Sequence, residues 1–124
     1  MFPNPEAGYG QIRRDTASPR QVEYRVLTSI AAEIEAADPA TPQGYRELAL
    51  ALQRNKQLWE ALAVDLSNPD NPLDDSLKAN LIGLAGYSVK TGQAVLQGEE
   101  DRLVLVNINR TVAAGLKPAT EVAA

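Results

Sequence analysis

The prolines of this chain divide it into a few stretches that are each long enough to form a helix. Ser18-Pro19 and Thr41-Pro42 each place a capping hydroxyl before a proline in the first helical position, which predicts a helix start at both sites. Pro69 and Pro72 are separated only by Asp70 and Asn71, and a helix cannot continue through such a segment. The proline positions therefore predict helices joined by short turns.

Apolar residues recur every three or four positions in each stretch between these breaks. The longest run, in which only the asparagine is strongly polar, consists of Tyr45, Leu48, Leu52, Asn55, Trp59, Leu62 and Leu66. Over residues 43–66 this run predicts a helix about 36 Å long at 1.5 Å per residue. Similar patterns predict helices that begin at Pro19, that follow a cap at Asp74 or Asp75, and that end near Gly115.

The expected fold class is all-α, an antiparallel four-helix bundle with an additional short N-terminal helical segment. We expect a loosely docked N-terminal segment at residues 1–17, the helical bundle at 18–117 and a disordered tail at 118–124. The apolar run Leu103–Val106 resembles a buried strand, but the chain has no second run of that kind to pair with it. A helix is therefore predicted there as well.

Small residues are concentrated in the third predicted helix, among them Gly83, Gly86 and Gly92. Each glycine costs up to about 1 kcal/mol of helix propensity relative to alanine. We expect close approach of a second helix of the same chain to compensate for this cost. The alternative is a shallow groove that accepts a helix from another protein.

The composition excludes the commonest catalytic side chains. The 124 residues include no cysteine and no histidine. Cysteine nucleophiles, disulfides, Cys/His zinc sites and histidine acid–base catalysis are therefore excluded. Nearby acids such as Glu33 and Glu35 point to different faces of a helix, and the sequence has no phosphate-binding glycine motif. We expect neither enzyme activity nor a cofactor.

The charge distribution disfavours nucleic acid as a partner. Twelve Lys and Arg against sixteen Asp and Glu give a net charge of −4, and the basic residues are spread along the chain. The stretch between Lys56 and Lys78 has five acidic residues and no basic one. Since phosphate neutralisation supplies most non-specific affinity, no direct nucleic-acid binding is expected. With no secretory signal pattern and no long apolar run, a cytoplasmic protein without membrane binding is expected.

Asparagines inside apolar stripes are the clearest candidates for partner contacts. Asn55 lies one turn before Trp59, and Asn107 and Asn109 flank Ile108 in the last predicted helix. In one interpretation Asn55 is buried and fixes helix register. In the other it is exposed and binds a partner's backbone in a groove floored by Trp59. For the other two asparagines, the alternatives are a contact or kink within the bundle and hydrogen bonds to a bound segment.

With the apolar residues of the same stripes and one aromatic residue of the N-terminal segment, these positions form the predicted partner-binding set. Its members are Tyr9, Asn55, Trp59, Leu62, Leu66, Leu81, Leu105, Asn107, Ile108 and Asn109.

Four segments carry a pattern that is specific when they are taken together. They are Leu52-x-x-Asn55-x-x-Leu58-Trp59, Asp65-Leu66-x-x-Pro69-x-Asn71-Pro72-Leu73, Leu77-x-x-x-Leu81-Ile82-x-Leu84-Ala85, and Val106-Asn107-Ile108-Asn109 with Ala114-Gly115-Leu116. Their order and spacing from Tyr24 to Leu116 resemble the flagellar biosynthesis regulator FlaF of alphaproteobacteria. The resemblance implies a cytoplasmic factor for flagellin production and filament assembly that works with the flagellin translation regulator FlbT.

A flagellin-binding chaperone is the function that this resemblance favours. It would hold the terminal helices of flagellin in the cytoplasm and couple flagellin synthesis and secretion to flagellum assembly. Those terminal segments are amphipathic and unpaired before polymerisation, so apolar grooves of a helical bundle suit them. FlbT is a second expected partner, and any effect on translation is then indirect.

Two other functions remain open. One is a regulator of flagellin mRNA translation that acts with FlbT through direct RNA contact, which requires a basic stripe such as Arg13, Arg14, Arg20 and Arg25. The other is a structural dimer that associates through the apolar run at residues 45–66.

Overall fold

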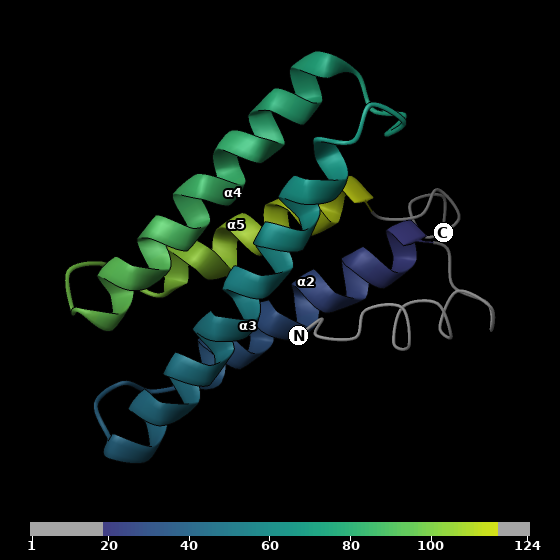
Figure 1. Ribbon diagram of the computed structural model, residues 1–124. Helices are drawn as coiled ribbons and strands as arrows, with labels where there is room; N and C mark the ends of the chain where they lie inside the picture. The colour runs from purple at the N-terminus through teal and green to yellow at the C-terminus, as the bar shows by residue number, and fades with distance from the viewer. Residues whose placement is uncertain (1–18, 117–124) are drawn as a thin grey trace.

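Four helices make up the part of the chain that the structure describes. The computed structural model describes residues 19–116 (Figure 1). The helices are α2 (Pro19–Ala36), α3 (Pro42–Leu66), α4 (Asp75–Leu96) and α5 (Leu103–Leu116). No strand occurs among residues 19–116, so the predicted all-α fold is confirmed, including the helical start of α5. The expected N-terminal segment, with Tyr9, and the expected tail lie outside the described residues.

Local sequence signals determine where α3 and α4 begin and end. The Thr41 hydroxyl accepts the Gly44 N–H at 2.9 Å, and the Asp74 carboxylate accepts the Leu77 N–H at 2.8 Å. These are N-caps at the predicted positions. After α4, Gly98 adopts a positive φ of 77°. This left-handed conformation commonly ends a helix, and glycine takes it without strain. The chain therefore turns where the capping residues and the prolines predict, and it turns again at Gly98.

The helices pack as two pairs, α2 with α5 and α3 with α4, and α2 also lies along α3 (Figure 1). Successive helices reverse direction along the chain, as expected for the antiparallel bundle. The largest buried apolar side chains come from α2, α3 and α5, and they are Leu27, Ile30, Ile34, Leu48, Leu58, Trp59, Leu105 and Val106. The apolar run of α3 is thus largely buried against the chain's own helices.

The glycines at the middle of α4 do not support close helix packing. A Cβ added at Gly83 or Gly86 would meet nothing within 4 Å, because both residues lie on the exposed face of α4. Only Gly92 faces the bundle, with atoms of Leu52 and Leu105 at 4.0 Å from its added Cβ. The expected compensation by a neighbouring helix of the chain is therefore wrong for Gly83 and Gly86. None of the described helices is long and apolar enough to span a membrane.

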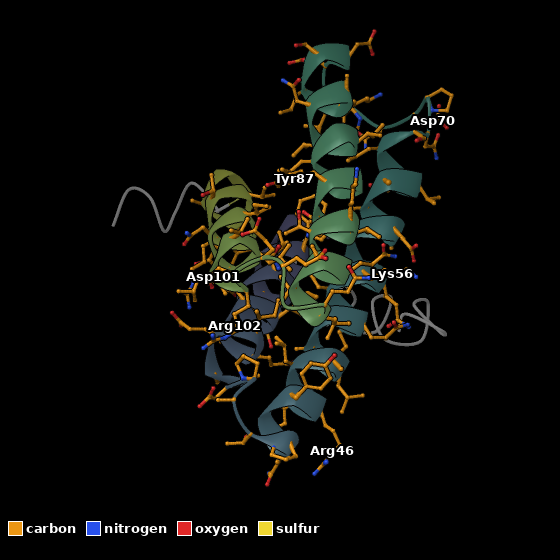
Figure 2. The ribbon with its side chains drawn as sticks, turned by 90° about the vertical axis from the view of Figure 1, so that its left-hand side faces the viewer. Arg46, Lys56, Asp70, Tyr87, Asp101 and Arg102 are labelled. Atoms are coloured by element: carbon orange, nitrogen blue, oxygen red, sulfur yellow. The ribbon has the colours of Figure 1, made fainter. Side chains whose placement is uncertain are left out.

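Polar contacts join α2 to α5 at the ends of the helices. At the start of α5, Arg102 donates from its guanidinium to the carbonyls of Ile34 and Glu35 at 3.1 Å, which caps the end of α2. Figure 2 shows Arg102 beside Asp101 at this end of α5. Further along α5, Arg110 forms a two-contact ion pair with the carboxylate of Glu35, the shorter at 2.8 Å. The two helices are therefore joined by charge as well as by apolar packing.

The ion pair of Glu35 and Arg110 predicts acid sensitivity. The hydrogen bond and the positive charge of Arg110 hold the pKa of Glu35 below its ordinary value. Because the folded-state pKa is the lower one, the pair stabilises the fold fully above the unfolded pKa of glutamate, about 4.3. This stability is lost as the pH falls through the lower folded-state pKa. Urea midpoints measured from about pH 6 to about pH 3 should therefore fall less for Glu35→Gln than for the native chain.

Glu60→Gln is the matched control, because Glu60 is exposed on α3 and the substitution is the same. Its pH profile should follow the native one. Equal flattening in both variants would contradict a specific role for Glu35.

Candidate functional site

An apolar groove opens at the end of the bundle where α3 turns into α4. We call it the α3–α4 groove, and its volume is about 190 Å³. Every described helix contributes to it, together with the loop between α3 and α4. Its lining residues are Glu23, Trp59, Leu62, Asp65, Leu66, Asn71, Pro72, Leu73, Leu81 and Val112.

The α3–α4 loop forms one wall of the groove and is held by side chain–backbone hydrogen bonds. The Asn71 amide donates to the Asp65 carboxylate at 3.2 Å and to the Asp65 carbonyl at 3.3 Å. The Asn71 side-chain oxygen accepts the Leu73 N–H at 3.0 Å, and that of Asn68 accepts the Asp70 N–H at 2.9 Å. Such Asx turns fix a loop without regular structure. The apolar side chain of Leu73 is thereby presented to the groove by an ordered wall.

Trp59 lines the groove from a position that is otherwise buried. Its indole N–H donates to the side-chain oxygen of Asn109 at 3.0 Å, and the Asn109 amide donates to the side-chain oxygen of Asn55 at 2.8 Å. All three residues are at least 98% buried. This network joins α3 to α5 across the core and holds the indole in one orientation.

The rim of the groove carries negative charge. Glu23 and Asp65 are among the lining residues, and none of the ten lining residues is basic. The exposed acids Asp70, Asp74 and Asp75 follow in the loop and at the start of α4. Figure 2 shows Asp70 on this loop, at the opposite end of the molecule from Arg46. A ligand with basic groups beside an apolar face therefore complements the site.

The groove and the buried network lie within a region that matches a known family. The family model described as flagellar protein FlaF matches residues 5–116. The chain belongs to the FlaF family. Searches of curated proteins and of solved structures gave no significant match to the chain. The FlaF region includes residues 5–18, which precede α2, and ends with the last residue of α5.

Four of the ten partner-binding residues predicted from the sequence line the α3–α4 groove of this FlaF fold. They are Trp59, Leu62, Leu66 and Leu81. The structure brings them together from α3 and α4. In α5, Asn107 is exposed and Ile108 is half-buried, and neither lines the groove. Tyr9 lies outside the described residues.

The buried asparagines have a structural role. Asn55, Asn109 and Leu105 are at most 2% exposed, so the interpretation that placed them at an exposed partner surface is wrong. Asn55 is buried, as in the other interpretation, and Asn109 makes a polar contact to a neighbouring helix, because its amide donates to the side-chain oxygen of Asn55. Burial is possible here because the two amides and the Trp59 indole satisfy one another.

The residues that close the groove are not among those predicted from the sequence. Glu23 and Val112 come from the ends of α2 and α5, whereas Asn71 and Leu73 come from the loop. One signal was available, since Leu73 is an apolar residue that directly follows the polar segment containing Pro69 and Pro72. An apolar side chain in such a corner indicates contact with the body of the protein.

Proposed function

We propose that this FlaF-family chain binds a terminal amphipathic segment of flagellin in the α3–α4 groove and holds flagellin before its secretion. The observation that carries the proposal is the open apolar groove at one end of the bundle. FlaF is a flagellar family, and flagellin is the flagellar subunit with exposed amphipathic segments before assembly. Helix-in-groove binding uses apolar anchors spaced three or four residues apart.

The charge of the rim narrows the kind of segment that fits. Glu23 and Asp65 lie beside the apolar lining and favour a helix with lysine or arginine next to its apolar stripe. The same acids oppose a phosphate backbone, which disfavours direct contact with flagellin mRNA. An effect on translation would then pass through bound flagellin or through FlbT, which we retain as a second proposed partner.

Two neighbouring substitutions on α4 test the groove. Leu81 is half-buried and lines the groove, whereas Ile82 lies on the exposed side of the helix. A Leu81→Glu chain should bind the organism's own flagellin about tenfold more weakly or worse, because the new carboxylate must be buried beside Asp65. Ile82→Glu should stay within about twofold of the native affinity. Isothermal titration calorimetry measures both affinities, and circular dichroism measures their folding.

A milder variant and a shortened ligand complete this experiment. Leu81→Ala removes apolar contacts without adding charge, so it tests the groove even where Leu81→Glu fails to fold. Flagellin that lacks its terminal segments should bind none of the variants. Equal binding by full-length and shortened flagellin would contradict the proposal, and salt-sensitive binding of RNA alone would support the translational alternative.

A further inference from the structure

The start of α2 lies at the edge of the α3–α4 groove. Glu23 lines the groove and comes one helical turn after Pro19, the first residue of α2. The 18 residues that precede α2 are therefore attached at the rim of the site. An extended chain spans about 3.3 Å per residue, so this segment is long enough to span the groove.

The sequence of this segment complements the groove. Tyr9 and Ile12 are apolar residues three positions apart, and Arg13 and Arg14 follow immediately. An apolar pair beside two basic residues matches an apolar lining that includes the acids Glu23 and Asp65 and has no basic residue among its ten described members.

Either end of the chain is a candidate to fill the α3–α4 groove, and the extent of the FlaF match favours the N-terminal one. The match begins at residue 5 and ends at residue 116, so it includes most of the segment before α2 and excludes residues 117–124. That final stretch has a single large apolar residue, Val122, and one basic residue, Lys117. The residues covered by the family match, the apolar content and the charge all favour the N-terminal segment as the occupant of the groove.

We propose that residues 5–16 occupy the α3–α4 groove of the free protein. Tyr9 and Ile12 pack against the apolar lining, and Arg13 and Arg14 lie at the acidic rim. The occupancy also has a consequence for flagellin binding, and this part rests on the proposed function. If flagellin binds in the same groove, its segment must displace the chain's own segment. The apparent affinity for flagellin is then the intrinsic affinity multiplied by the fraction of molecules in which the N-terminal segment has left the groove.

Paramagnetic labelling of the full chain tests this occupancy. The chain has no cysteine and one tryptophan, so Gln11→Cys gives a single nitroxide site and Trp59 gives a single indole N–H signal in the NMR spectrum. The nitroxide should broaden the Trp59 signal strongly. Adding Tyr9→Ala and Ile12→Asp to the labelled chain should restore most of the signal. Equal broadening with and without these two substitutions would overturn the proposal.

Two further labelled samples test whether the C-terminal tail or a second copy of the chain occupies the groove instead. A nitroxide at Val122→Cys that broadens Trp59 more than the one at Gln11→Cys would assign the groove to the tail. Mixing labelled chains with isotope-enriched, unlabelled chains detects a second copy, since only intermolecular contact broadens Trp59 in that sample. Either result would overturn occupancy by the chain's own N-terminal segment.

Flagellin affinity separates this inference from the proposed function. The unlabelled Tyr9→Ala/Ile12→Asp chain should bind flagellin about three- to tenfold more tightly than the native chain, because no segment has to be displaced. Release of the Trp59 signal with unchanged flagellin affinity would confirm occupancy and count against the groove as the flagellin site. Tight flagellin binding without any broadening from Gln11→Cys would support the proposed function and overturn the occupancy.

Discussion

A Gly44→Ala chain should lose a large part of its stability. A Cβ at Gly44 would lie 1.8 Å from the carbonyl oxygen of Asp38, 2.7 Å from its carbonyl carbon and 2.8 Å from the hydroxyl oxygen of Thr41. Backbone atoms cannot rotate away as a flexible side chain can, so the turn between α2 and α3 must shift. The shift also breaks the cap in which Thr41 accepts the Gly44 N–H. Overpacking and loss of the cap together should cost about 2–4 kcal/mol.

The same substitution at Gly83 is the matched control. An added Cβ there meets nothing within 4 Å, and the residue lies exposed within α4. Gly83→Ala should therefore stabilise the chain by up to about 1 kcal/mol, through helix propensity alone. Urea denaturation monitored by circular dichroism measures both changes. Shifts of the same sign in the two variants would refute the role assigned to Gly44.

An Asn109→Ala chain should lose about 2–4 kcal/mol of unfolding free energy. The substitution leaves the Trp59 indole N–H and the side-chain oxygen of Asn55 without the partners that they have in the native fold. A buried polar group that loses its partner costs about 1–3 kcal/mol. The emission of Trp59 should change as well, because its indole is no longer held by Asn109.

Asn107→Ala serves as the control for this variant. Asn107 lies two residues earlier in α5 and is exposed, so its replacement should change stability by no more than about 0.5 kcal/mol. Urea midpoints and fluorescence spectra of the two variants make the comparison. Equal losses would mean that the network of Asn55, Trp59 and Asn109 contributes no more than an exposed asparagine.

The predictable part of this fold is the part that depends on local chemistry. The helix starts at Thr41-Pro42 and Asp74 follow from capping, which involves residues only three positions apart. The meeting of Asn55 with Asn109 depends on how α3 and α5 cross, and no spacing along the sequence contains that information. Both asparagines therefore had two open interpretations until packing decided between them.

The same distinction explains the errors at α4 and at the groove. Helical spacing groups Trp59, Leu62 and Leu66 on one side of α3, so part of the groove was predictable from periodicity. The outward orientation of Gly83 was not, because α4 packs mainly on α3 and leaves that face open. The loop wall around Asn71 was not predictable either, because hydrogen bonds within the loop determine the shape of that wall.

Every described helix contributes to the α3–α4 groove, so an occupant of the groove would affect the stability of the whole fold. The lining residues come from both helix pairs, yet α4 and α5 touch each other little. A segment bound in the groove therefore bridges the two pairs, and its binding free energy adds to the stability of the whole fold. Since modest losses of stability change protein abundance in cells several-fold, a bound flagellin segment would extend the lifetime of the protein to the extent that it stabilises the fold more than the chain's own N-terminal segment does.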